Sequence, residues 1–339
     1  MGSGRWSTDV YTAAADYRAA SGASAFDYSD RVTASAPRRD WKAHPSLDPA
    51  ALKGGKVRES RDCDEHPTSL AISVIFDVTG SMRSVPRILQ TKLPSLFGLI
   101  LRKGYVEHPQ ILFGAVGDAT CDRVPLQLGQ FESDNRMDDD LGNILLEGGG
   151  GGQLTESYEL ALYAMARHTA LDCHEKRGRR GYLFLIGDEM PYGKVKAREV
   201  REVFGDTLEA DIPVTAILAE LRRKFDVYFI VPQGASHVGN TDILQRWQGL
   251  LGQNVVELDD LDAVCETIAL TIGLGEEAID LEAGLEDLAD VGSTAGDSVG
   301  RALATLGRER ATIAVSDSPL IDPSSHDGAD HGPSTTTRL

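Results

Sequence analysis

The chain of 339 residues has few cysteines, no long apolar run and fewer basic than acidic side chains. Its four cysteines (Cys63, Cys121, Cys173 and Cys265) lie far apart without a C-x-x-C pair, which argues against a zinc site or a disulfide framework. No stretch is long and apolar enough to cross a bilayer, and the N-terminus lacks the basic-then-apolar order of a secretion signal. We therefore expect reduced thiols in a cytoplasmic protein, or in a virus or particle assembled in the cytoplasm.

Basic side chains are in the minority, with 34 Lys and Arg against 52 Asp and Glu, which gives a formal net charge of −18. A protein of this charge repels phosphate backbones and anionic membrane surfaces. We therefore expect neither direct nucleic-acid binding nor membrane binding. Residues 276–339 hold 13 acidic and 4 basic side chains, so this tail contributes −9, half of the formal charge.

Apolar runs that suit buried strands alternate with segments of helical spacing between residues 69 and 272. The run LAISVIFDV is typical of a strand that is buried on both faces. This order predicts an α/β fold with a Rossmann-like, doubly wound, mostly parallel sheet and helices on both faces. The predicted strands are 69–77, 111–116, 182–186, 227–231 and 255–258, with a possible edge strand at 126–131; the predicted helices are 85–101, 156–171, 195–204, 214–224, 243–251 and 261–272.

Two flanking segments lack the strand pattern of residues 68–275. Residues 1–67 form an N-terminal extension, or arm, that is rich in Ala, Ser, Arg and Asp and contains scattered aromatic side chains. Val10, Tyr11 and Tyr17 fit one face of a short helix, and the aromatic residues suggest that the extension wraps onto its own domain or onto a neighbour. The acidic tail, 276–339, is predicted to be partly helical and then disordered.

Small polar residues follow the first predicted strand at a spacing that suits a metal ion. Asp77, Thr79 and Ser81 place a carboxylate and two hydroxyls at alternate positions around the glycine turn D-V-T-G-S. Hard oxygen ligands of this kind are those that a magnesium-like ion prefers. In open parallel sheets, ligands bind at the carboxyl ends of the strands, where this turn lies. The sequence therefore predicts a divalent metal site at this edge.

The same residues resemble the metal-ion-dependent adhesion site of the von Willebrand factor A family. The family motif has Asp-x-Ser-x-Ser after the first strand, a Thr from a second loop and an Asp after a later strand. Asp77 and Ser81 match, while Thr79 replaces the first Ser and keeps a hydroxyl. Thr155 follows a glycine-rich turn and matches the Thr, and Asp188 ends an apolar strand and matches the last Asp. Three matching segments are far more specific than the five-residue motif alone.

This resemblance covers about residues 69–275 and implies a von Willebrand factor A fold that binds Mg²⁺ or Mn²⁺. Ser81 and Thr79 would bind the ion directly, and Asp77 and Asp188 directly or through waters. The ion would keep one position open for a carboxylate of a partner protein. We therefore expect a non-enzymatic protein-interaction module, such as an adaptor for an AAA+ ATPase or another complex.

Further acidic side chains follow the predicted strands, and the sequence is compatible with two other functions. Asp118, Glu156 and Glu189 are predicted at the same edge, where they either support the metal ligands or are ordinary solvated carboxylates. One alternative function is a structural or assembly component of a phage or bacterial particle, in which the extension and the tail make the contacts. Another is a metal-dependent hydrolase in which Glu156 or Glu189 is the general base.

Three enzyme motifs are absent or incomplete. The glycine run at 148–152 is not followed by Lys-Ser/Thr, so it does not predict a phosphate-binding P-loop. A haloacid-dehalogenase-type phosphatase needs a second Asp two residues after Asp77, where this chain has Thr79. No G-x-S-x-G sequence is present, so a serine hydrolase has no obvious nucleophile.

Overall fold

A six-stranded sheet runs through the centre of the molecule, with its strands in the order β12-β11-β7-β2-β3-β4. The computed structural model describes residues 6–22, 24, 26–149, 152–304 and 306. Neighbouring strands are parallel except for β4, which runs antiparallel to β3 at one edge. The prediction of an α/β fold with a mostly parallel sheet is therefore confirmed. The strands are β2 (Leu70–Asp77), β3 (Pro109–Val116), β4 (Leu126–Leu128), β7 (Gly181–Ile186), β11 (Phe225–Pro232) and β12 (Val255–Leu258).

The central strand β2 is buried along its whole length because it lies between β3 and β7. Its register brings Asp77 opposite Val116 of β3 and Phe76 opposite Ile186 of β7. The strand order changes direction between β2 and β7, since the chain moves outward to β3 and then returns to β7. The loops that follow these strands therefore meet at one edge, at the position where open α/β sheets bind ligands.

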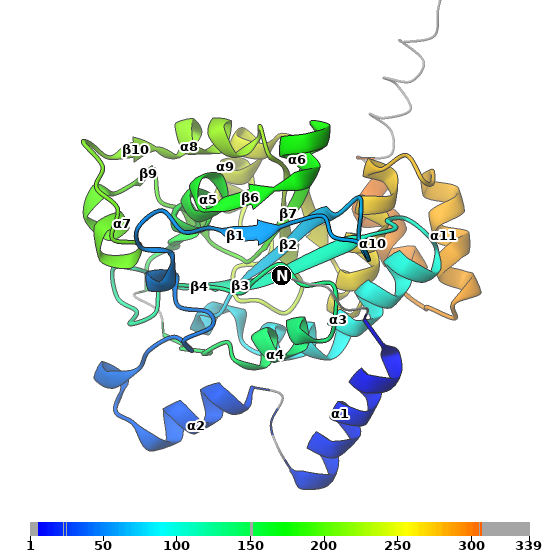
Figure 1. The fold of residues 1–339 in the computed structure, drawn as a ribbon, viewed down its shortest axis with the longest axis horizontal. Helices are drawn as coiled ribbons and strands as arrows, with labels where there is room; N and C mark the ends of the chain where they lie inside the picture. Colours follow the sequence, from blue (N-terminus) through cyan, green and yellow to red (C-terminus); the bar gives the residue numbers. More distant parts are fainter. Residues whose placement is uncertain (1–5, 23, 25, 150–151, 305, 307–339) are drawn as a thin grey trace, which may run out of the picture.

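Helices cover both faces of the sheet (Figure 1). On one face α3 (Val85–Arg102) packs against α10 (Val264–Gly275), and on the other α5 (Tyr158–Arg167) packs against α8 (Val214–Leu221). α9 (Thr241–Leu251) packs on β11 and β12. Each of these helices overlaps a predicted one, because each carries an apolar stripe at helical spacing.

The N-terminal extension wraps onto its own domain. Phe26, Leu47 and Leu52 are buried in the same apolar core as the sheet, and the Trp6 ring lies 5.5 Å from the Phe97 ring of α3. The predicted short helix is present, but Tyr17 is 73% exposed, so the face predicted to be apolar points to solvent. The elements of the extension are α1 (Thr8–Ser21), α2 (Asp27–Ser35), η1 (Arg38–Asp40), η2 (Pro49–Leu52) and β1 (Arg58–Ser60).

Several predicted boundaries are corrected by short strands. The helix predicted over 156–171 is α5 alone, and its last residues instead form β6 (Thr169–Leu171), which pairs in parallel with β1. The helix predicted from residue 195 begins later, as α7 (Ala197–Val203), because β9 (Lys194–Val195) pairs with β10 (Ile212–Pro213). The remaining short elements are β5 (Thr155–Glu156), β8 (Met190–Pro191), η3 (Gly80–Met82), η4 (Leu261–Ala263), α4 (Arg136–Gly142) and α6 (Asp172–Arg177).

After the last strand the chain continues into α11 (Leu281–Asp290), which packs on α10. Leu288, Val299 and Leu303 are buried in the common core, so the first part of the acidic tail belongs to the folded body. The disorder predicted further along falls on residues 307–339, which lie outside the described residues. None of the four cysteines, all of which the structure describes, forms a disulfide. Within the described part of the chain, no helix combines the length and apolarity needed to span a membrane.

Candidate metal centre

The turn after β2 and the glycine run meet at the carboxyl edge of the sheet. The Gly80 amide donates a hydrogen bond of 2.7 Å to the carbonyl of Gly149. A Cβ at residue 80 would lie 3.1 Å from the Gly148 carbonyl oxygen and 3.2 Å from that of Gly149. A larger residue at position 80 would therefore crowd this close approach of two backbones, and the approach places Thr79 and Ser81 beside the glycine run.

Four of the five predicted metal ligands form one hydrogen-bonded cluster. Asp77 Oδ1 accepts hydrogen bonds from the Thr79 amide at 2.7 Å and from Thr79 Oγ1 at 2.6 Å. Thr79 Oγ1 lies 3.1 Å from Ser81 Oγ, and Ser81 Oγ donates to Asp188 Oδ1 at 2.7 Å. The loops after β2 and β7 thus bring two hydroxyls and two carboxylates together.

Two donors that the sequence analysis missed hold the carboxylates in place. The buried Tyr158 hydroxyl donates to Asp77 Oδ2 at 3.0 Å, and the backbone amide of His237 donates to Asp188 Oδ2 at 2.9 Å. Tyr158 begins α5 with the spacing of a core aromatic residue, and a backbone amide has no sequence signature. Only the fold, which brings α5 and the loop after β11 to this edge, reveals them.

Thr155, the fifth predicted ligand, has no described hydrogen bond to this cluster. It lies in β5, where it pairs with Met190 of β8, and its hydroxyl contacts the hydroxyl of Tyr192. Successive side chains of a strand point in opposite directions. The next residue, Glu156, therefore lines the cavity at the cluster. At this position the structure places a carboxylate where the resemblance predicts a threonine hydroxyl.

Glu156 and Glu189 form a buried pair beside the cluster. Their carboxyl groups are hydrogen-bonded to each other, and Oε2 of each is buried without a hydrogen-bond partner. The Glu189 carboxylate also lies 3.5 Å from Nε2 of His237. Each therefore keeps one buried oxygen with unused capacity to accept a proton or bind a cation.

Asp118, predicted at the same edge, is already hydrogen-bonded within the protein. Its carboxylate accepts from the Thr120 amide and hydroxyl at 2.8 and 2.7 Å and from the Tyr192 hydroxyl at 3.1 Å. It also accepts a hydrogen bond from the side-chain amide of Gln153. Because Gln153 lines the cavity at the cluster, Asp118 acts here by fixing the position of a neighbouring side chain.

Acidic side chains are concentrated at this edge, and the basic side chain that contacts them is His237. Within the described part of the chain, no Lys or Arg forms an ion pair with any of these carboxylates. Burial raises the pKa of Asp77 to about 7, and burial together with Glu189 raises the pKa of Glu156. Desolvated carboxylates are costly unless a cation compensates them. The five buried carboxylates, each at most 4% exposed, are Asp77, Asp118, Glu156, Asp188 and Glu189.

A cavity of about 440 Å³ opens onto the cluster. Thr79, Ser81, Glu156 and Glu189 line it, together with His237 from the loop after β11. In the described residues, no three His, Cys, Asp or Glu side chains are arranged to hold an ion by themselves. The cluster offers hydroxyl and carboxylate oxygen atoms, a donor type that suits Mg²⁺ or Mn²⁺ better than a thiophilic metal.

No family model matches the chain, and no curated protein matches it. Among solved structures it is similar to the pilus adhesin SpaC from Lactobacillus rhamnosus GG in an open conformation, with a TM-score of 0.43, 12% identity, and coverage of 65% of this chain and 31% of the adhesin. It is also similar to proximal thread matrix protein 1 from the mussel byssus, with a TM-score of 0.40, 11% identity, and coverage of 63% and 49%. The chain spans between about a third and a half of the length of these proteins.

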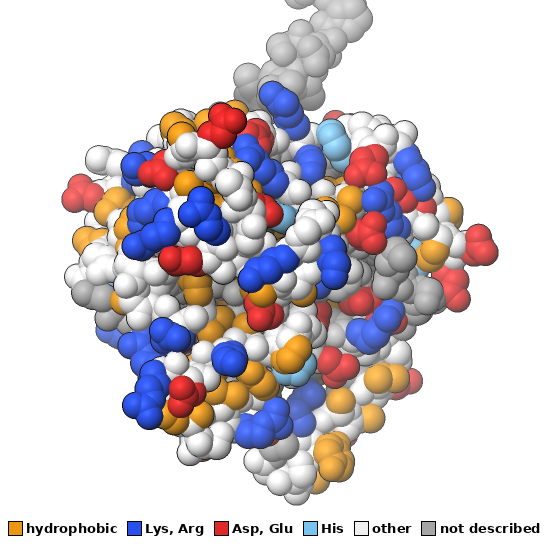
Figure 2. All heavy atoms as spheres, turned by 60° about the vertical axis from the view of Figure 1, so that its left-hand side comes forward, with side chains coloured by type: hydrophobic (Ala, Val, Ile, Leu, Met, Phe, Trp, Pro, Cys, Tyr) orange, Lys and Arg blue, Asp and Glu red, His pale blue; other side chains and the backbone are white. Residues whose placement is uncertain are grey.

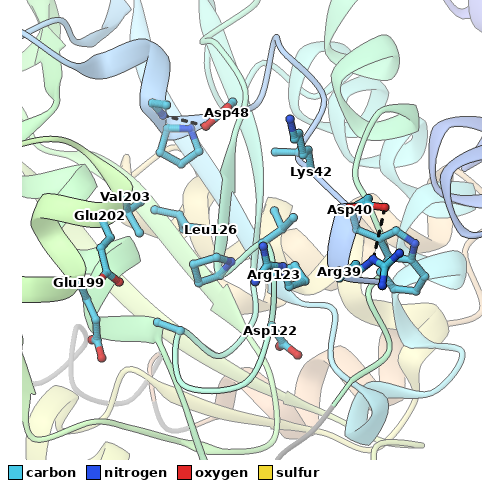
Figure 3. Close-up of a pocket in the computed structure, with 17 residues that line it drawn as sticks. Arg39, Asp40, Lys42, Asp48, Asp122, Arg123, Leu126, Glu199, Glu202 and Val203 are labelled. Carbon is cyan, nitrogen blue, oxygen red and sulfur yellow. Dashed lines mark hydrogen bonds and ion pairs between the residues drawn. The ribbon is translucent and has the colours of Figure 1, made fainter. Parts of the chain in front are cut away.

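A second, larger cavity of about 730 Å³ lies beyond the loop that carries Asp118. Figure 3 shows α7 residues such as Glu202 on one side of it and Arg39 and Lys42 of the N-terminal extension on the other. Figure 2 shows that Lys and Arg side chains are numerous on the face where α7 and the extension meet. This cavity contains none of the predicted metal ligands, and its walls carry charges of both signs.

Proposed function

We propose that this chain is a von Willebrand factor A-like interaction module that binds Mg²⁺ or Mn²⁺ at the carboxyl edge of its sheet. The observation that carries the proposal is the hydrogen-bonded cluster of Asp77, Thr79, Ser81 and Asp188, which lies open to a cavity among buried carboxylates. These carboxylates have no Lys or Arg partner among the described residues. The cost of burying them favours a bound cation.

The residues have separate tasks in this proposal. Ser81 and Thr79 hold the ion through their hydroxyls, and Asp77 and Asp188 supply negative charge, directly or through waters. Tyr158 and the His237 amide keep the two aspartates oriented, as hydrogen bonds to metal-ligating carboxylates commonly do. When bound, the cation offsets the buried charge and attracts a carboxylate of a partner protein, such as an AAA+ ATPase, into the cavity.

Binding of the ion is tested by isothermal titration of the purified chain with MgCl₂ and MnCl₂ after treatment with EDTA. The wild type should take up one ion with a saturable isotherm. Ser81→Ala and Asp188→Asn should each weaken binding by about tenfold or more, since each removes one charge-assisted contact.

Ser84→Ala is the matched control. Ser84 lies three residues after Ser81, its side chain is exposed, and it makes no capping hydrogen bond to the helix that follows. It should bind the metal like the wild type. Absence of metal uptake by a folded wild-type protein would refute the proposal, and so would unchanged binding by the Ser81 and Asp188 variants. Partner binding is tested by affinity capture from the native host with and without EDTA.

A further inference from the structure

The opposite edge of the sheet carries a concentration of arginine. β7 begins at Gly181 and β11 at Phe225, and these two residues are register partners in neighbouring parallel strands. Two consecutive arginines precede β7, and Arg-Arg-Lys precedes β11. Because the strands are in register, both loops deliver their arginines to the same place at the amino edge of the sheet.

The four arginines of these two loops line a single cavity of about 420 Å³. Its lining residues are Gly178, Arg179, Arg180, Tyr182, Arg222, Arg223, Asp226, Gly275 and Glu276. Four guanidinium groups and two carboxylates leave a formal charge of +2 in this cavity, although the whole chain carries −18. Such a reversal of the overall charge sign in one cavity favours an anionic ligand.

The described contacts leave part of this positive charge available. Arg179 is paired with Glu276, and Arg180 lies 2.9 Å from Asp226, but both arginine side chains remain about half exposed. The guanidinium of Arg223 makes no hydrogen bond or ion pair with the described residues. A ligand in the cavity could therefore reach three guanidinium groups without breaking a buried contact.

Basic residues near helix C-termini have an ordinary structural use, because they stabilise the negative end of the helix dipole. Arg222 fits that use, since it follows α8 and donates a hydrogen bond of 2.6 Å to the carbonyl of Leu250. Helix stabilisation does not require four arginines from two different loops to line one cavity. Arg223 also follows α8 and interacts electrostatically with Glu220, but its guanidinium forms no ion pair with the described residues, and Arg179 stays about half exposed although it pairs with Glu276.

We propose that this arginine cavity binds a phosphate monoester. Guanidinium groups bind phosphate through paired, charge-assisted hydrogen bonds. A phosphate monoester carries a charge of about −1.5 to −2 at neutral pH, which matches the excess charge of the cavity. The ligand is either a small phosphorylated metabolite or a phosphorylated serine or threonine of a protein. A nucleic-acid strand is disfavoured by the net charge of the chain.

The test is isothermal titration in EDTA, so that metal bound at the other edge cannot contribute. The probes are glycerol 3-phosphate, a phosphoserine peptide and the same peptide without phosphate. The wild type should bind at least one phosphorylated probe with a saturable isotherm, and the stronger probe identifies the source of the phosphate. Arg179→Gln with Arg223→Gln should weaken binding by about tenfold or more.

The matched control is Arg198→Gln with Arg201→Gln on α7, which removes the same charge from exposed positions outside the cavity. It should bind the phosphorylated probe like the wild type, and thermal melts should show that all variants are folded. Equal weakening by both double variants would indicate a general charge effect and overturn the proposal. Failure of the folded wild type to bind either phosphorylated probe, or equal binding of the unphosphorylated peptide, would overturn it as well.

Discussion

At the scale of single residues, Thr155 and Glu156 are neighbours in β5, and the alternation of side chains along a strand lets only one of them face the proposed metal centre. In the structure that residue is Glu156, whose carboxyl group lies in the cavity with one unpartnered oxygen. This arrangement depends on the pairing of β5 with β8. The structure and the family motif therefore predict opposite orders for the effects of Thr155 and Glu156 variants on metal binding.

We predict that Glu156→Gln weakens Mg²⁺ binding more than Thr155→Val does. The first variant replaces an acid that can lose its proton beside the ion by a neutral amide, and the second removes a hydroxyl that contacts Tyr192. The loss for Glu156→Gln should be about tenfold, measured by titration in the same buffer. The opposite ranking would show that Thr155 is the metal ligand and that the register of β5 changes when the ion binds.

A second buried acid, Glu159, leads to a prediction about pH. Both of its carboxyl oxygens lack a hydrogen-bond partner, and burial together with the charge of Glu199 raises its pKa to about 8. A pKa that is higher in the folded than in the unfolded state means that the folded state binds more protons. Stability should therefore fall as the pH rises from about 4.5 to 8, by up to about 1.4 kcal/mol per pH unit.

The measurement is the free energy of unfolding in urea at several pH values in EDTA. Glu159→Gln should flatten this pH dependence, because glutamine mimics the protonated acid. Glu282→Gln on α11 is the control, since that side chain is exposed. If the Glu159 variant retains the full slope of the wild type, the loss of stability arises from another group.

At the scale of elements, the close contact between the turn after β2 and the glycine run determines the shape of the metal centre. Gly80→Ala would place a Cβ 3.1 Å from a carbonyl oxygen of the opposing backbone, so the two loops must move apart. We predict weaker Mg²⁺ binding, by about tenfold or more, with a smaller effect on the thermal melt. Gly193→Ala is the matched control, because nothing lies within 4 Å of its added Cβ. Equal metal affinity of both variants would contradict a positioning role for this contact.

The elements also show which parts of the fold can be predicted from the sequence. Long strands such as β2 were predictable because burial on both faces leaves a near-continuous apolar run. Strands of two residues, such as β5 and β8, were not predictable, since their pairing depends on residues far away in the chain. The clustering of Asp77, Thr79, Ser81 and Asp188 could be predicted from the motif and from the ends of the strands. Which of Thr155 and Glu156 faces the cavity depends on the pairing of β5 with β8, which the sequence does not show. The hydrogen bond from the His237 amide to Asp188 depends on how the loop after β11 folds.

At the scale of the whole molecule, the N-terminal extension is part of the core. Phe26, Leu47 and Leu52 are at most 2% exposed, and burial of each large apolar side chain contributes about 1.5–3 kcal/mol. We predict that deletion of residues 1–56 lowers the melting temperature strongly and promotes aggregation, measured by calorimetry and size-exclusion chromatography. A deletion variant that remains monomeric with an unchanged melting temperature would show that the sheet and its helices fold without the extension.

The buried carboxylates and the arginine cavity lie at opposite ends of the same strands. β11 has eight residues, and a strand of that length spans about 26 Å. In physiological salt the Debye length is about 8 Å, so an ion in one open cavity is separated from an ion in the other by several Debye lengths of solvent. The proposed cation and the proposed phosphate can therefore be bound at the same time without touching, one at each end of the sheet.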